Sequence, residues 1–452
     1  MDRQRRYVVI GAGIVGTVLA HRLATAGAAV ALLDRDRPGR GTSRWSFAWL
    51  NSNNKTPRGY HDLTVHGMEA WARLAAVADG GAWYRPVGNL RWAACEDGRR
   101  ELAGRVARLR DWGYAARVTD RREVARLEPA LALPADVAEV AWFPDEGYVL
   151  TEPLIDGLIR RTVAAGAELR TAGAGEAVAV AVARTRDGGW SVTTADGGRV
   201  TGDVLVCCAG RWTPGVSGLA GRPVPVVEPE SAGSEAPGLA VRVGPVAAPP
   251  VRVAHTPLVH LRAHGADTVH LEAADADVDL HTPEAELDRW AGVLLERARH
   301  VMPSLATARV LERTVCIRPL PLDGLPAVGP ADGAAVDGGP AGGSPYVVVT
   351  HSGVTLAAGL AEPRRAGAAG GRTGARAGAV PAGAVRLTYG AAGTRPVRRK
   401  GGRYGVKAGV LVRRKGRAYG SGTPHRTALT RPPGTPYARF IRDFDVTHRE
   451  PR

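Results

Sequence analysis

Residues 7–36 read YVVIGAGIVGTVLAHRLATAGAAVALLDRD, and this stretch decides the fold. It opens on YVVI, a short, β-branched apolar run of the kind that a buried parallel strand requires. Gly11, Gly13 and Gly16 follow directly in the G-x-G-x-x-G spacing. The first glycine of this spacing permits a tight turn, the second lets the backbone approach a pyrophosphate, and the third lets the next helix pack closely on the strand. The stretch therefore predicts the strand, turn and helix of a dinucleotide-binding unit.

The second half of the stretch completes this unit. A helix is predicted over residues 14–26, because Gly27 is a natural helix stop. Its N-terminus presents free N–H groups and the positive end of the helix dipole to phosphates. The apolar strand AVALL follows and ends at Asp34. An acid at this place, roughly 20 residues past the glycines, bonds a ribose hydroxyl and disfavours a 2′-phosphate. NADP is therefore the least expected ligand, while FAD and NAD both stay open.

The charge of the chain is divided unevenly. Its 452 residues, enough for two or three domains, carry a formal net charge of +16. Residues 1–362 hold 39 Lys and Arg against 41 Asp and Glu, whereas residues 363–452 hold 21 against 3. The body is near neutral and the whole basic excess belongs to the tail. This tail is rich in Gly, Arg, Ala and Pro and has no helical or strand periodicity, which predicts disorder.

The sequence disfavours a membrane-spanning or secreted protein, and it disfavours a protein built around a metal site or disulfides. No apolar run approaches the roughly 18 residues of a transmembrane helix, and the N-terminus shows no cleavable apolar segment. The expectation is therefore a cytoplasmic protein. The four cysteines, Cys95, Cys207, Cys208 and Cys316, have neither metal-ligand spacing nor the pattern of a disulfide framework. No metal site is predicted.

The rest of the chain alternates between two patterns. Residues 223–275 show Val and Leu alternation broken by Pro and Gly, which predicts a run of antiparallel strands. Residues 346–350 form a last apolar strand, after which a helix is expected to begin at Ser352 or Gly353. That repeats the strand, glycine and helix order of the N-terminus. Aromatic residues alternate with small ones over residues 45–49, which predicts a short strand there.

Six blocks of this sequence, in this order, resemble the D-amino-acid-oxidase-like (DAO) family of FAD-dependent oxidoreductases, which includes glycine oxidase and bacterial D-amino-acid dehydrogenases. The blocks are GAGIVG…LLD, GTS, EGYVLTEPL, VLVCCAGRW, CIRPLPLDGLPAVGP and VVVTHSGVTLAAGL, and the resemblance extends over residues 6–362. It favours FAD over NAD. It also implies an α/β fold in which a Rossmann-like FAD-binding domain is interleaved with a mostly antiparallel β-sheet substrate domain.

The resemblance implies a domain division. Residues 1–80, 146–220 and 313–362 are expected in the FAD-binding domain, and residues 81–145 and 221–312 in the substrate domain. Residues 363–452 form the basic low-complexity tail.

The resemblance also implies the site residues. It assigns the ADP half of FAD to Gly11, Gly13, Gly16 and Asp34, with Val178 against the adenine. It places Gly41, Thr42 and Ser43 along the pyrophosphate and flavin, and Ala209 and Gly210 at a strand end near the cofactor. Gly353, Val354 and Thr355 match the turn that faces the flavin pyrimidine ring. Arg318 matches the family arginine that binds a substrate carboxylate, a role for which the bidentate guanidinium is well suited. His351 is expected to be structural.

The activity implied is oxidation of an amine-bearing small carboxylic acid, an amino or imino acid, by hydride transfer from Cα to flavin N5. The amine is expected to arrive neutral, so that no strong protein base is needed. Whether oxygen or a quinone reoxidises the flavin stays open. The alternatives are a flavin-dependent hydroxylase, an NAD-dependent dehydrogenase, and an inactive or purely binding protein.

The last alternative comes from the tail. Pro363 ends the final helix where the family normally continues it, and a shortened helix there is expected to weaken the retention of FAD. The basic clusters of the tail suggest a nucleic-acid or anionic-surface tether. The 56 Arg against 4 Lys favour instead an out-of-frame reading of a GC-rich gene.

Overall fold

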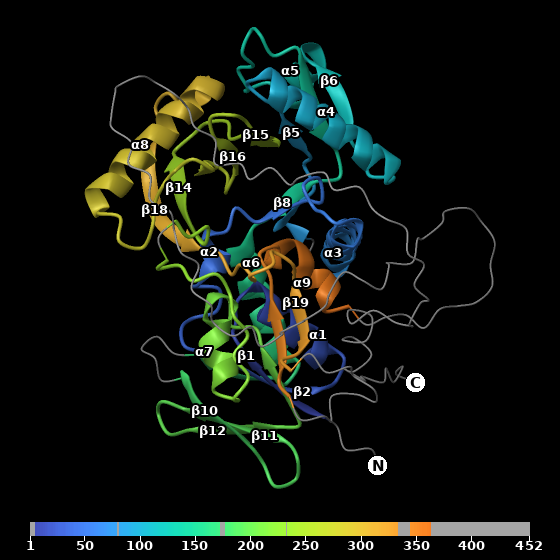
Figure 1. Ribbon diagram of the computed structural model, residues 1–452, viewed down its shortest axis with the longest axis vertical. Coiled ribbons are helices and arrows are strands. Elements are labelled where there is room, and N and C mark those ends of the chain that lie inside the picture. Colours follow the sequence, from blue (N-terminus) through green and yellow to red (C-terminus); the bar gives the residue numbers. More distant parts are fainter. Residues whose placement is uncertain (1–4, 79–80, 172–176, 232, 333–343, 363–452) are drawn as a thin grey trace, which may run out of the picture. The chain divides into compact units, whose positions relative to one another are not determined.

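The computed structural model describes residues 5–78, 81–171, 177–231, 233–332 and 344–362 (Figure 1). The tail of residues 363–452, for which disorder is predicted, lies outside the described residues.

A six-stranded sheet carries the dinucleotide-binding unit. Its order is β19-β20-β13-β1-β2-β9, and all neighbours are parallel except β19 and β20. The strands are β1 (Arg6–Ile10), β2 (Ala29–Asp34), β9 (Glu168–Thr171), β13 (Val204–Cys207), β19 (Ala327–Pro330) and β20 (Tyr346–Val349). Ile10 lies opposite both Leu33 and Cys207. The turns that follow β1, β2 and β13 therefore emerge together at one edge of the sheet, where ligands bind in open α/β folds.

The two faces of this sheet are covered differently. Tyr7 and Val9 point into the main core, and Val8 and Ile10 point to the other face, as the two-residue period of a strand requires. On the first face lie α1 (Ile14–Thr25), α3 (Arg58–Val77), α6 (Thr151–Ala164) and α9 (Gly353–Leu360). A small antiparallel sheet of β10 (Ala179–Arg184), β11 (Trp190–Thr194) and β12 (Arg199–Gly202) packs on the second face. Both faces are thus buried, which explains the unbroken apolar runs of β1 and β2.

The second large sheet has eight strands. Its order is β18-β14-β17-β16-β15-β5-β7-β6, and all neighbours are antiparallel except β15 and β5. The strands are β5 (Asn89–Arg91), β6 (Arg117–Asp120), β7 (Glu139–Phe143), β14 (Pro237–Gly244), β15 (Val253–His255), β16 (His260–Ala263), β17 (Val269–Glu272) and β18 (Arg309–Ile317). Helix α8 (Glu284–Val301) packs along β14 and β18, and α4 (Glu96–Asp111) and α5 (Arg121–Leu127) pack beside β6 (Figure 1).

The remaining elements are short. They are α2 (Thr42–Trp45), β3 (Trp49–Leu50), β4 (Tyr84–Arg85), β8 (Gly147–Val149), the single turns η2 (Gly210–Trp212) and η3 (Pro303–Leu305), and α7 (Thr213–Gly218). β8 pairs with both β3 and β4.

The predicted fold class is confirmed: a parallel Rossmann-like sheet is interleaved with a mostly antiparallel one. The predicted strand over residues 45–49 is wrong. Residues 42–45 are helical, and only Trp49 and Leu50 are in a strand. Trp45 is half-buried, and the guanidinium of Arg242 stacks 4.5 Å from its ring, so this side chain makes a cation–π contact and does not lie on a sheet face. The domain boundaries stay predictions, and β18 spans the one placed between residues 312 and 313.

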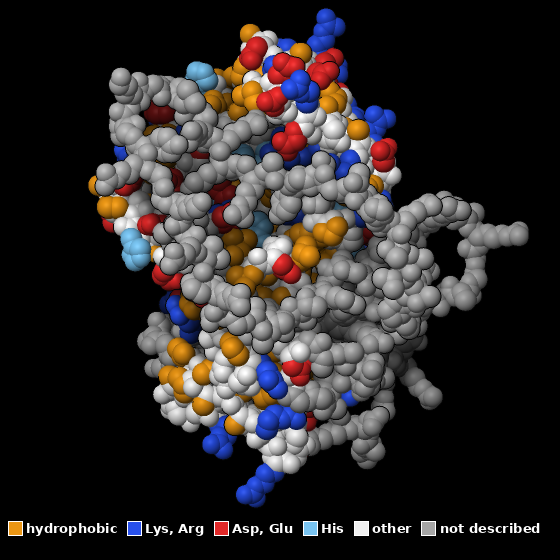
Figure 2. All heavy atoms as spheres, viewed as in Figure 1, with side chains coloured by type: hydrophobic (Ala, Val, Ile, Leu, Met, Phe, Trp, Pro, Cys, Tyr) orange, Lys and Arg blue, Asp and Glu red, His pale blue; other side chains and the backbone are white. Residues whose placement is uncertain are grey.

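The surface carries charges of both signs. Figure 2 shows acidic and basic side chains interspersed over the region of α4 and α5, where Arg100 pairs with Glu96 and Arg105 with Glu101. No helix within the described ranges is long and apolar enough to cross a membrane. Within the same residues, no group of three or more His, Cys, Asp or Glu is arranged to hold a metal ion.

Candidate active site

A pocket of about 380 Å³ opens at the edge of the six-stranded sheet where β1, β2 and β13 end. It gathers most of the predicted cofactor residues although they lie far apart in the chain. Those that line it are Gly11, Gly13, Asp34, Gly41, Thr42, Ser43, Val178, Ala209, Gly210, Gly353 and Val354. The turn between β20 and α9, at Gly353, therefore lines the same pocket as the glycine turn between β1 and α1.

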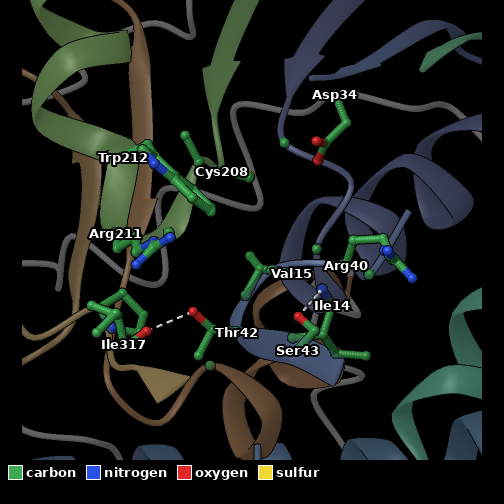
Figure 3. Close-up of a pocket in the computed structure, with 18 of the residues that line it drawn as sticks. Ile14, Val15, Asp34, Arg40, Thr42, Ser43, Cys208, Arg211, Trp212 and Ile317 are labelled. Atoms are coloured by element: carbon green, nitrogen blue, oxygen red, sulfur yellow. Dashed lines mark hydrogen bonds between the residues drawn. The ribbon is translucent and has the colours of Figure 1, made fainter. Parts of the chain in front are cut away.

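The acid at the tip of β2 is tied to the glycine turn. One oxygen of Asp34 accepts a hydrogen bond from the Ala12 N–H at 2.6 Å, and the other accepts one from the Asp36 N–H at 3.0 Å. Figure 3 shows the carboxylate pointing toward the turn. Burial raises the pKa of Asp34, while these two backbone donors lower it. Each carboxylate oxygen has further lone pairs with which to accept a ribose hydroxyl.

The GTS loop, residues Gly41, Thr42 and Ser43, is hydrogen-bonded to the start of the helix that follows the glycine turn. Ser43 Oγ accepts a hydrogen bond from the N–H of Ile14, the first residue of α1, at 2.9 Å. Thr42 Oγ1 donates to the carbonyl of Ile317 at 2.7 Å (Figure 3). Ile317 is the last residue of β18 and lines the pocket. The loop thus joins the glycine turn of the six-stranded sheet to the end of β18 in the eight-stranded sheet.

An aromatic and arginine stack, which the sequence reasoning missed, forms one wall of the pocket. The guanidinium carbons of Arg35 and Arg211 lie 4.2 Å and 4.3 Å from the Trp212 ring. Arg211 and Trp212 lie across the pocket from Ile14 in Figure 3. Their signal in the sequence is the AGRW end of the β13 block, which follows the Ala209-Gly210 pair that the prediction did use.

The other end of the pocket is formed by the start of α9. Ser352 precedes this helix, and its hydroxyl shares a hydrogen bond of 2.7 Å with the hydroxyl of Tyr60. His351 lines the pocket and is exposed to it. Burial, with Lys55 and Arg318 as nearby positive charges, lowers the pKa of His351 to about 4. The imidazole is therefore neutral at pH 7 and is part of the pocket wall.

Two of the predicted cofactor residues do not line the pocket. A Cβ at Gly16 would lie 1.9 Å from the carbonyl oxygen of Gly11, so Gly16 serves the packing of α1 on the turn. Thr355 is buried, and its hydroxyl donates to the carbonyl of Trp49 at 3.0 Å. Gly16 and Thr355 therefore stabilise the elements that form the pocket without lining it.

Arg318 also lies outside the set of pocket-lining residues, directly after Ile317, which lines the pocket. Its Nε donates to the carbonyl of Ala236 at 3.3 Å, and its Nη2 donates to the carbonyls of Glu235 and Pro237. Nη1 makes no hydrogen bond with any described residue. The guanidinium is thus held in place by backbone and keeps one nitrogen for a further acceptor.

Two more ionisable side chains adjoin Arg318 and His351, and sequence reasoning found neither. Glu272, at the end of β17, has its pKa raised to about 7 by burial, against the positive charges of Arg318 and Arg262. Lys55 is 9% exposed, and burial lowers its pKa to about 8. Its ammonium makes no hydrogen bond with any described residue.

The segment that leads to Lys55 is anchored on one buried carboxylate, that of Glu146, which has no exposed surface. The carboxylate accepts hydrogen bonds from Trp49, Ser52, Asn53, Asn89 and Tyr114. Burial raises the pKa of Glu146 to about 7, and these donors lower it. Because the contacts donate to the carboxylate, they favour its ionised form. Glu146 in turn raises the pKa of Lys55, against the effect of burial.

The parallel sheet, its glycine turn and the acid at the tip of β2 define a dinucleotide-binding protein of the Rossmann type. The residues fit a dinucleotide that spans the pocket, since a Cβ at Gly13 would meet only the Ser43 hydroxyl, 3.3 Å away, and the backbone is otherwise open to the cavity. The family is also evident from its sequence profile, which matches residues 6–363. The chain belongs to the DAO family, described as FAD dependent oxidoreductase.

Two curated relatives match about half of the chain. One is 4-methylaminobutanoate oxidase (formaldehyde-forming) from Paenarthrobacter nicotinovorans, 30% identical over 50% of this chain and 27% of its own length. The other is the tRNA 5-methylaminomethyl-2-thiouridine biosynthesis bifunctional protein MnmC from Chromohalobacter salexigens, 28% identical over 49% of this chain and 30% of its own length. The chain therefore matches less than a third of either relative.

Solved structures share the fold. Glycine oxidase from Geobacillus kaustophilus superposes with a TM-score of 0.64 at 20% identity, covering 79% of this chain and 93% of that one. Iminodiacetate oxidase (IdaA) from Chelativorans sp. BNC1 gives a TM-score of 0.62 at 22% identity, covering 78% of this chain and 93% of that one.

Proposed function

We propose that this chain binds FAD and oxidises an amine-bearing small carboxylic acid, an amino or imino acid, by hydride transfer from Cα to flavin N5. One observation carries the proposal. A single pocket runs from Asp34 at the tip of β2 to Gly353 and His351 at the start of α9, and Arg318 and Glu272 adjoin its far end. A dinucleotide cofactor and an ionic substrate can therefore meet there.

The chain's own groups have distinct tasks. The glycine turn and the GTS loop hold the pyrophosphate with backbone N–H groups. The first N–H groups of α9 face the flavin, where a helix N-terminus stabilises negative charge. Arg318 receives the substrate carboxylate on the guanidinium nitrogen that the backbone leaves open. When bound, FAD supplies the hydride acceptor, and the protein supplies binding and orientation.

The names of the similar proteins support this substrate class. A methylaminobutanoate oxidase, a glycine oxidase and an iminodiacetate oxidase are all named for substrates that combine an amine with a carboxylate. The chain matches only part of the first, and it resembles the other two at the level of fold.

The experiment starts with an absorbance spectrum of the purified protein, with and without added FAD. Flavin bands, followed by anaerobic bleaching with one member of an amino-acid panel, support the proposal. Formation of hydrogen peroxide in air then identifies oxygen as acceptor, and a response only to a quinone identifies a dehydrogenase.

The same measurements separate the alternatives. Flavin that is reduced by NADPH and not by amino acids supports a hydroxylase. Colourless protein that reduces NAD with a substrate supports a plain dehydrogenase. Protein that never takes up FAD supports an inactive or purely binding product of the altered C-terminus, and it refutes the proposal.

A further inference from the structure

Glu272 ends β17 close to Arg318 and to Cys316, which lines the pocket. Its side chain keeps 33% of its surface accessible. β17 nevertheless lies inside the eight-stranded sheet, between β14 and β16, and burial raises the pKa of Glu272 to about 7. The nearby thiol of Cys316, whose pKa Glu272 raises, lines the pocket. Glu272 is therefore partly exposed, next to a residue that lines the pocket, and a small molecule can reach its carboxylate.

The cations nearest to Glu272 donate their hydrogen bonds to backbone carbonyls and not to Glu272. Arg262 donates from Nε, Nη1 and Nη2 to the carbonyls of Phe47, Ala263 and Ser46. Arg318 donates from Nε and Nη2 to carbonyls at the start of β14. Neither guanidinium comes within ion-pair distance of Glu272. Both act on it through space and lower its pKa.

Only one contact of ion-pair length reaches Glu272 within the described part of the chain. Its Oε1 lies 3.7 Å from Nε2 of His270. Burial and the charge of Arg262 hold the pKa of His270 well below its usual range, so this histidine is neutral at pH 7. Partial burial of a carboxylate without a contacting cation costs free energy, and a cationic ligand relieves that cost.

We infer that Glu272 binds the ammonium group of the substrate and takes its proton before hydride transfer. This rests on the proposed function. The step is balanced: one N–H bond of the substrate ammonium breaks, an O–H bond forms on Glu272, and the electron pair stays on nitrogen. That pair then forms the C=N bond as the Cα–H bond breaks and its hydride passes to FAD. The substrate thus arrives protonated, and not neutral as the sequence analysis expects.

The charges around Glu272 give the expected pH dependence. The groups that face it are Arg318 after β18, Arg262 on β16, His270 on β17 and Cys316 on β18, with a backbone contact from Phe47. Only the ionised carboxylate binds an ammonium and accepts its proton. Flavin reduction is therefore slow below the pKa of Glu272 and rises as the pH increases through about 7.

The test uses FAD-loaded enzyme and ligand pairs that differ only in the amine. N-methylglycine is compared with butanoate, and 4-methylaminobutanoate with hexanoate, by anaerobic perturbation or reduction of the flavin spectrum. The wild type is expected to prefer the amine member of at least one pair. Glu272→Gln is expected to lower that preference at least tenfold, to keep carboxylate binding, and to lose the pH dependence near 7. Glu139→Gln, an exposed change on β7, is the matched control.

Three results overturn the inference. They are a wild type without preference for either amine, a Glu272→Gln variant that keeps both preference and pH profile, and a variant that loses both members of a pair equally. The last outcome means a structural role. Failure of the proposed function is recognised separately, because then the wild type holds no FAD or no amino acid of the panel reduces it.

Discussion

Ser43 Oγ accepts a hydrogen bond from the N–H of Ile14 at 2.9 Å, across 29 residues of sequence. Ile14 begins α1, so this N–H is one of the first-turn donors without a partner inside the helix. The bond pins the GTS loop to the glycine turn. The two segments proposed to bind the pyrophosphate are consequently held in one geometry before any ligand arrives.

Ser43→Ala removes this acceptor. We expect a loss of about 1 kcal/mol in the stability of the apoprotein, as for other helix N-terminal acceptors, and a several-fold weaker affinity for FAD. Thermal unfolding and titration of the apoprotein with FAD measure the two effects. Ser304→Ala serves as control, because Ser304 is exposed and its hydroxyl makes only a 3.5 Å contact. Unchanged FAD affinity in Ser43→Ala would contradict the role given to this bond.

Alanine substitutions at two glycines of the turn are expected to have different effects, one on FAD affinity and the other on folding stability. At Gly13 the new Cβ meets only the Ser43 hydroxyl, at 3.3 Å, so Gly13→Ala should fold and yet bind FAD at least tenfold more weakly. At Gly16 the new Cβ would lie 1.9 Å from the Gly11 carbonyl oxygen, so Gly16→Ala should unfold at a clearly lower temperature. Circular dichroism and FAD titration separate the two outcomes.

Gly104→Ala is the control for both changes. Gly104 lies in α4 with nothing within 4 Å of a Cβ, so this substitution should raise stability by up to about 1 kcal/mol and leave FAD binding intact. A Gly13→Ala variant that binds FAD as the wild type does would show that the pyrophosphate lies elsewhere.

Arg318→Met removes the expected carboxylate anchor. The KM for the amino-acid substrate should rise at least tenfold, while the FAD content stays unchanged. Since Arg318 lowers the pKa of Glu272, its removal should also move the midpoint of the pH–rate profile to higher pH. Steady-state kinetics over a pH series measure both effects, with the exposed α8 change Arg289→Met as control. Unchanged kinetics would remove Arg318 from the site.

The cofactor pocket could largely be predicted from sequence, because its residues belong to local motifs. Gly11, Gly13 and Asp34 belong to one βαβ unit, and Gly353 repeats the same device. The substrate end could not be predicted in this way. Glu272 lies near the pocket only because β17 pairs with β14, which in turn pairs with β18. No local spacing encodes that pairing.

Local sequence patterns also fail to predict the structure of residues 45–55. Its aromatic alternation predicts a strand, but Trp45 lies in α2, half-buried, and stacks against Arg242 instead of a sheet neighbour. Lys55 is brought to the site by a turn that Glu146 holds from 93 residues away, through Asn53. Contacts of such range depend on the whole fold.

Stability at acid pH should depend on His260. Its ring centre lies 4.4 Å from that of His255, and burial lowers the pKa of His260 to about 4 from an ordinary value near 6.5. Between these two values the unfolded chain binds the proton and the folded chain does not. The stabilisation present above pH 6.5 is therefore lost as the pH falls toward 4. We expect the Tm to drop steeply over that range, as measured by thermal unfolding at a series of pH values.

His260→Phe keeps an aromatic ring at this position and removes its titration. The variant should lose less of its Tm between pH 7 and pH 4.5 than the wild type loses, although His255, whose pKa burial also lowers, retains part of the dependence. His300→Phe changes an exposed histidine of α8 and should leave the dependence unaltered. If His260→Phe and the wild type lose the same Tm on acidification, then protonation of His260 does not limit the acid stability of the folded chain.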